Sequence, residues 1–165
     1  MQPAERVVTV WLALCSVTAR AGCVQFMPGS HKSGQLQHKE IPDADNMLAF
    51  GQTCPAAGDP VSAVLQAGEA SIHSFFTVHG SGGNEEDWDR LGLAIRYFCS
   101  DEVQKSGAVE REMVTCVSGE PSPYFDVEQA PSVVLGESEQ ALWKEAMRRE
   151  NANYFQSSQQ KAHKL

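Results

Sequence analysis

GEASIHSFFTVHGSGGNEEDWDRLGLAIRYF, residues 68–98, decides the fold of this chain because it is typical of two β-strands joined by a glycine-rich turn. Apolar and polar residues alternate in its first half, which predicts one continuous strand with His73 and His79 on the same face. The GSGGN segment that follows supplies the glycines and the asparagine that tight turns favour. The second strand is predicted to start at about Arg90, with Arg90 and Gly92 on one side.

Two side chains of this segment have chemistry suited to a ligand or a metal ion. An arginine holds a carboxylate through two parallel hydrogen bonds, and the small residues Gly92 and Ala94 beside Arg90 leave room for a small anion. A neutral imidazole such as that of His79 suits a metal ion. Two plainer interpretations remain open, in which Arg90 pairs with an acidic residue of the turn and His79 bonds to its own backbone.

Two separate motifs resemble one enzyme family. The HGSGGN motif at residues 79–84, followed by Arg90, resembles the last metal-binding motif of the phytanoyl-CoA dioxygenase family of iron(II)- and 2-oxoglutarate-dependent oxygenases. VTVWLALCSVTARAGCVQFMPGSHK, residues 8–32, is similar to the strand, turn, strand and PGSH segment of that family. The two motifs occur in the order that the family has, which makes a chance similarity a poor explanation.

The resemblance implies a set of roles and cofactors. By this resemblance His79 is a metal ligand, Arg90 and Ser81 bind the carboxylate of 2-oxoglutarate, and Trp11 lines the cofactor pocket. The implied cofactors are Fe(II) and 2-oxoglutarate, and the implied activity is oxygenation of a small organic or acyl substrate. Hydroxylation and halogenation both remain open, as does the identity of the substrate.

The chain also departs from the family pattern. Family members hold iron with two histidines and one carboxylate, and the first histidine and the carboxylate form a His-x-Asp or His-x-Glu pair. No such pair occurs in this sequence. We therefore expect the C-terminal half of an oxygenase, present as a fragment, a mis-started gene model or a degenerate copy, and inactive or nearly so alone. His73 is expected to be a pocket or core residue that cannot share a metal with His79, since six residues of extended chain span about 20 Å.

The predicted fold is mainly β. We expect an incomplete double-stranded β-helix, of the jelly-roll or cupin type, in residues 1–117, with a connector and a C-terminal helix in residues 118–165 packing on it. The helix is predicted to have Ser138 as its N-cap and Glu139 in its first turn. Strands are predicted at residues 6–17, 22–27, 61–66 and 112–117, and a long loop at residues 28–59 with a short strand near 47–50.

The charge and hydrophobicity of the chain argue against two classes of partner, nucleic acids and membranes. The net charge of −8, without any long run of lysine or arginine, argues against a nucleic-acid surface. The apolar run at residues 7–17 is much shorter than the roughly 20 residues that span a bilayer, so no membrane partner is expected. A small-molecule substrate is the expected partner, and the oligomeric state stays open.

The five cysteines are widely spaced and form no C-x-x-C pair, which is not a zinc pattern. Cys15, Cys23, Cys99 and Cys116 lie in apolar contexts and are predicted to be small buried hydrophobes, so a reducing, cytoplasmic location is expected. The C-terminal residues AHKL only approach a peroxisomal address, which leaves the peroxisome as the alternative.

Two other functions remain open. One is a non-catalytic, truncated or degenerate homologue that acts as a small-acid binder or an interaction protein. The other is an unrelated cupin-type metalloprotein, although the clustered histidine and glutamate ligands usual for that class are missing from the sequence.

Overall fold

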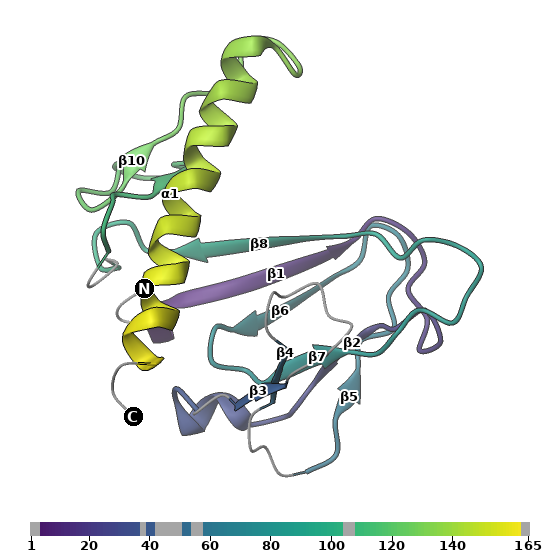
Figure 1. Cartoon of the computed structure of the whole chain (residues 1–165). Helices are drawn as coiled ribbons and strands as arrows, with labels where there is room; N and C mark the ends of the chain where they lie inside the picture. Colours follow the sequence, from purple (N-terminus) through teal and green to yellow (C-terminus); the bar gives the residue numbers. More distant parts are fainter. Residues whose placement is uncertain (1–3, 37–38, 42–50, 54–57, 104–107, 163–165) are drawn as a thin grey trace. The chain divides into compact units, whose positions relative to one another are not determined.

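The computed structural model of the chain describes residues 4–36, 39–41, 51–53, 58–103 and 108–162. The chain divides into two compact units, one formed by Val7–Tyr97 and the other by Met1–Arg6 together with Phe98–Leu165. In the described residues the first unit consists of strands, loops and one short 3-10 helix, and the second contains the long helix, drawn in yellow-green in Figure 1. The prediction of a mainly β chain with a C-terminal helix is confirmed.

The first sheet of the Val7–Tyr97 unit has the order β6-β1-β8. Its central strand β1 (Val7–Ala13) is rich in valine, threonine and tryptophan, which favour the pleated conformation, and lies between β6 (Ala70–Ser74) and β8 (Gly92–Phe98). The β1 and β6 strands are antiparallel, with Thr9 opposite His73 and Trp11 opposite Ser71. Directly opposite residues point to the same side, so these four side chains share one face of the sheet.

The second sheet has the order β5-β2-β7, with β2 (Val24–Phe26) between β5 (Val61–Ser62) and β7 (His79–Ser81). Its register places Phe26 opposite His79 and Val24 opposite Ser81. A separate antiparallel pair joins β3 (Lys39–Ile41) to β4 (Gly51–Thr53). The short 3-10 helices η1 (Ala4–Arg6) and η2 (Ser30–Ser33) complete the N-terminal part of the chain.

The two three-stranded sheets contact each other through aromatic side chains. The ring centroid of Phe26 lies 4.6 Å from that of His73, so the faces that carry these two residues are turned toward one another. Among the described residues of this unit, those that are buried are Val7, Ala13, Val17, Ala21, Cys23 and Val24. Each fully buried valine among them stabilises the fold by about 1.5–3 kcal/mol.

The second unit is built on α1 (Glu137–Ala162), with the short parallel strands β9 (Met113–Val114) and β10 (Asp126–Val127). Arg148 binds both Glu110 and Glu145, and Arg149 binds Glu145 and Asp126. Because these ion pairs are exposed, each contributes little to the free energy of folding. Together they attach one face of α1 to the segments that carry Glu110 and Asp126. In the same unit, Phe125 is 2% exposed and contacts Phe98 with ring centroids 5.0 Å apart.

Several predicted boundaries are wrong. The strand that begins at Ala70 ends at Ser74, because Ser74 accepts hydrogen bonds from Thr77 N and Phe76 N and so turns the chain. The strand that was expected to start at about Arg90 starts at Gly92. The helix starts at Glu137, so the predicted N-cap at Ser138 lies inside it.

Other predictions changed in part. Residues 28–59, predicted as a loop, contain η2, β3 and β4, and the predicted strand near residues 47–50 lies outside the described residues. The proline-rich connector predicted after residue 117 contains β10. Cys23 is buried as predicted, Cys15 and Cys116 are half-buried, and Cys99 is exposed, so it is not the small core residue that we expected.

Candidate functional site

His79 is held in one tautomer by the backbone just before its strand. Its Nδ1 lies 2.8 Å from the carbonyl oxygen of Thr77, which can only accept a hydrogen bond, so Nδ1 carries a proton and, in the neutral ring, Nε2 has the lone pair that can bind a metal ion. A second contact fixes the residue before it, because Ser30 Oγ accepts a hydrogen bond from Val78 N at 2.9 Å and donates one to Met27 O at 2.7 Å. The serine of the PGSH segment thus positions the strand that carries His79.

The glycine-rich turn after His79 packs against Gly22. Gly22 has a φ of +70°, and a Cβ atom there would lie 2.5 Å from the carbonyl oxygen of Gly82 and 2.8 Å from that of Gly83. Ser81 Oγ donates a hydrogen bond to Gly22 O at 2.6 Å, and Glu85 N donates one to Arg20 O at 2.8 Å. The hydroxyl proton of Ser81 is therefore used within the fold, and this side chain would have to rotate to donate to a carboxylate.

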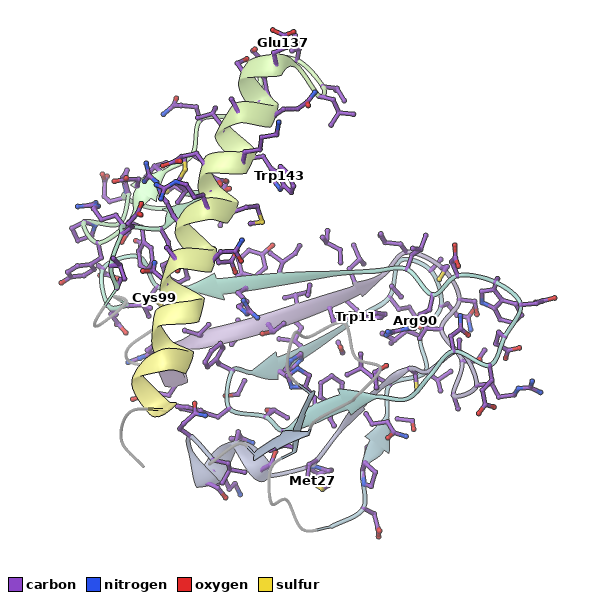
Figure 2. The ribbon with its side chains drawn as sticks, viewed as in Figure 1. Trp11, Met27, Arg90, Cys99, Glu137 and Trp143 are labelled. Carbon is purple, nitrogen blue, oxygen red and sulfur yellow. The ribbon has the colours of Figure 1, made fainter. Side chains whose placement is uncertain are left out.

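Trp11 and Arg90 contact each other. The Cζ atom of Arg90 lies 5.8 Å from the ring centroid of Trp11, and Figure 2 shows the two side chains next to one another. A guanidinium over an indole is held by a cation–π interaction. Among the residues that the structure describes, Arg90 forms no ion pair with the acidic side chains of the turn, so the plainer interpretation of Arg90 is not borne out there.

The space beside Arg90 is not the open room that we expected. A Cβ atom on Gly92 would collide with Cζ2 of Trp11 and lie 2.7 Å from Cη2, so the indole ring lies directly over this glycine. The glycine is required by the tryptophan, because any larger side chain here would displace the indole ring. The alternation that places Trp11 on the same face as Thr9 is consistent with the observed register.

His73 lies much closer to His79 than the sequence suggested. Their ring centroids are 4.9 Å apart, with the rings tilted by 56°, whereas an unbroken strand would separate the residues by about 20 Å. The predicted separation is wrong, because the turn at Phe75 and Phe76 ends the strand and folds β7 back toward β6. Burial, followed by the proximity of His79, lowers the pKa of His73 below its ordinary value and favours the neutral imidazole.

The inner side of β6 carries polar atoms without partners. Both ring nitrogens of His73 and the Oγ of Ser71 are buried and make no hydrogen bond in the described part of the chain. Buried polar atoms are nearly always satisfied in native proteins, so such a group indicates a missing water or ligand. Ser71 was missed in the sequence, although ASIHS places Ser71 and His73 at alternate positions and therefore on one face of the strand.

The donor set of the described residues fits part of an iron site. His79 offers one imidazole nitrogen, and His73 brings a second imidazole within contact of the first. Within residues 4–36, 39–41, 51–53, 58–103 and 108–162, no group of three or more His, Cys, Asp or Glu could hold a metal ion. A complete two-histidine, one-carboxylate site is therefore absent from this part of the chain.

Comparison with known proteins agrees with the motifs. The model of the family Phytanoyl-CoA dioxygenase (PhyH) matches residues 1–92. The peroxisomal phytanoyl-CoA dioxygenase of Bos taurus is 25% identical over 126 residues, which are 70% of this chain and 37% of that protein. The enzyme of the same name from Rattus norvegicus is 27% identical over 104 residues, which are 61% of this chain and 30% of that protein. The chain thus spans about a third of the length of these curated relatives.

Solved structures show a similar fold over nearly the whole chain. The apo form of the non-heme monooxygenase ThoJ superposes with a TM-score of 0.80 at 25% identity, covering 93% of this chain and 55% of that chain. Its nickel complex gives a TM-score of 0.71 at 22% identity, covering 94% of this chain and 54% of that chain.

The described residues contain no helix whose length and hydrophobicity would allow it to span a lipid bilayer.

Proposed function

This chain belongs to the phytanoyl-CoA dioxygenase family. We propose that it functions as an Fe(II)- and 2-oxoglutarate-dependent oxygenase that acts on a small organic or acyl substrate, with His79 as a metal ligand. The observation that carries the proposal is the state of His79, whose Nδ1 faces the Thr77 carbonyl and whose Nε2 keeps a free lone pair. The two facing sheets, and the fold similarity to ThoJ, support a double-stranded β-helix as the scaffold. Bound Fe(II) would supply oxygen activation coupled to oxidation of 2-oxoglutarate.

Each side chain of the site has a distinct task in this proposal. His79 Nε2 would bind the metal ion, and the Thr77 carbonyl would keep the ring in the correct tautomer. Arg90, without an ion pair in the described residues, would bind the distal carboxylate of 2-oxoglutarate through its two parallel N–H groups. Trp11 would hold the guanidinium in place from one side and exclude water, and Ser81 would add a hydroxyl contact after rotating away from Gly22.

A second candidate function rests on a specific observation. The sequence contains no His-x-Asp or His-x-Glu pair, which favours a non-catalytic homologue that binds a small acid through Arg90. The two functions differ in one measurable property. An oxygenase site couples the metal ion to 2-oxoglutarate, because the two bind in contact, whereas a small-acid binder has no such coupling.

The experiment is anaerobic calorimetry of 2-oxoglutarate binding to the chain, with and without Fe(II). The oxygenase proposal predicts that Fe(II) tightens 2-oxoglutarate binding by at least about tenfold, or about 1.4 kcal/mol. His79→Ala should abolish the tightening, and His31→Ala, on an exposed side chain, is the matched control. Binding of 2-oxoglutarate that ignores Fe(II) would support the small-acid binder instead. An absence of any 2-oxoglutarate binding would contradict both functions.

A further inference from the structure

The proposed function assigns no task to the three unsatisfied polar atoms on the inner side of β6. They are Ser71 Oγ and the two ring nitrogens of His73, all buried and without a hydrogen bond in the described residues. Serine and histidine at these two positions alternate with Ile72, which is 72% exposed on the opposite side of the strand. The pattern places the polar groups on the side that faces the second sheet, where Phe26 contacts His73.

These polar atoms lie between the two ends of the proposed site. Arg90 contacts Trp11, and Trp11 is directly opposite Ser71 across the β1–β6 pair. His73 is the next residue on the same side of β6, about 6.6 Å further along the strand. The His73 ring then contacts the ring of His79 at 4.9 Å. The inner side of β6 therefore connects the guanidinium at one end to the metal-binding imidazole at the other.

A bound 2-oxoglutarate would follow this same path. Its distal carboxylate would be at Arg90 and its 2-oxo acid end at the metal on His79, so its length would run along Ser71 and His73. The oxygens of its two carboxylates and of its keto group only accept hydrogen bonds, and the serine hydroxyl and an imidazole N–H both donate. The unpaired donors of the strand thus match the unpaired acceptors of the ligand.

We propose that Ser71 and His73 bind oxygen atoms of 2-oxoglutarate directly, as the polar wall between Arg90 and His79. This inference rests on the proposed function, since it takes Arg90 and His79 as the two ends of the ligand. It also explains why these donors are buried without partners. A buried donor without a hydrogen bond destabilises the fold, and a bound ligand would supply that hydrogen bond. The role is that of binding and orienting the ligand, without any transfer of a proton.

The test uses the full chain and 2-oxoglutarate as the probe. On the wild-type chain, ¹⁵N spectra of histidine-labelled protein should show the His73 ring signals moving as 2-oxoglutarate is added, while those of His31 stay in place. His73→Phe keeps the ring that packs on Phe26 but removes both nitrogens, and should weaken 2-oxoglutarate binding by about tenfold or more. Ser71→Ala should also weaken binding, whereas Ser62→Ala, on an exposed serine, should not.

The outcomes separate this inference from the proposed function. If 2-oxoglutarate binds in an Arg90-dependent manner while the His73 signals stay in place and His73→Phe binds as the wild type does, the inference is wrong and the function stands. Failure of the wild-type chain to bind 2-oxoglutarate at all would overturn both. The spectra of the wild-type chain do not depend on the folding of any variant, so the test remains decisive if His73→Phe is unstable.

Discussion

Gly22→Ala is expected to destabilise the fold through two separate effects. The φ of +70° at Gly22 is left-handed, which costs a residue with a Cβ about 1–2 kcal/mol. The new Cβ would also lie 2.5 Å from the Gly82 carbonyl oxygen, and relieving such overpacking costs about 1–3 kcal/mol more. The loss of chain entropy in the unfolded state returns about 0.4–1 kcal/mol. The free energy of unfolding should therefore fall by about 1–5 kcal/mol.

Gly29→Ala is the matched control for this change. Gly29 has nearly the same φ, +76°, but no heavy atom lies within 4 Å of the position of its added Cβ. Only the backbone cost then applies, so Gly29→Ala should lower the free energy of unfolding by about 1 kcal/mol. Urea unfolding followed by tryptophan fluorescence measures both variants. Equal losses of stability in the two variants would refute the close packing of the GSGGN turn on Gly22.

Three further changes follow from the same structure. Gly92→Ala should lower the free energy of unfolding by about 1–3 kcal/mol and change tryptophan emission, because the methyl group displaces the Trp11 ring; unchanged emission would contradict the contact. The pKa of Glu139 is lowered from 4.5 to about 2 by hydrogen bonds from Ser138 and Ser132, so its contribution to stability is complete above pH 4.5 and is lost as the pH falls toward 2. Glu139→Gln should flatten that pH dependence in acid unfolding curves. Ile72→Lys should reduce self-association in light scattering, since Ile72 is 72% exposed on the outer face of the β6-β1-β8 sheet.

The sequence predicted the parts of the site that depend on local pattern. The alternation in β1 places Trp11 with Thr9, and the HGSGGN motif identifies the turn after His79. The turn after Ser74 was not predictable in this way, because Phe75 and Phe76 are aromatic residues that favour a strand and carry no turn signal. What ends the strand is a set of hydrogen bonds to Ser74, which leave no signal in hydrophobic periodicity.

Contacts between segments that are distant in the sequence could not be predicted either. The small size of Gly92 suggested space for a ligand, but that space is filled by the Trp11 side chain, which comes from β1, about eighty residues earlier in the sequence. The sequence did not indicate the role of Gly22, since that role depends on the carbonyl groups of Gly82 and Gly83 in the turn that follows β7. The burial of Ser71 and His73 likewise follows from the packing of the two sheets, which only the folded chain reveals.

The roles of His79 and Arg90 are tested most directly by the visible charge-transfer absorption that Fe(II) and 2-oxoglutarate produce only when they bind together. Under anaerobic conditions the wild-type chain should develop this band when both are added, weakly because a complete two-histidine, one-carboxylate site is absent from its described residues. His79→Ala should abolish the band, and Arg90→Lys should need about tenfold more 2-oxoglutarate to reach it, since lysine loses the two-donor fork. A band that survives His79→Ala unchanged, or no band in the wild-type chain at saturating concentrations of both, would contradict the proposed site.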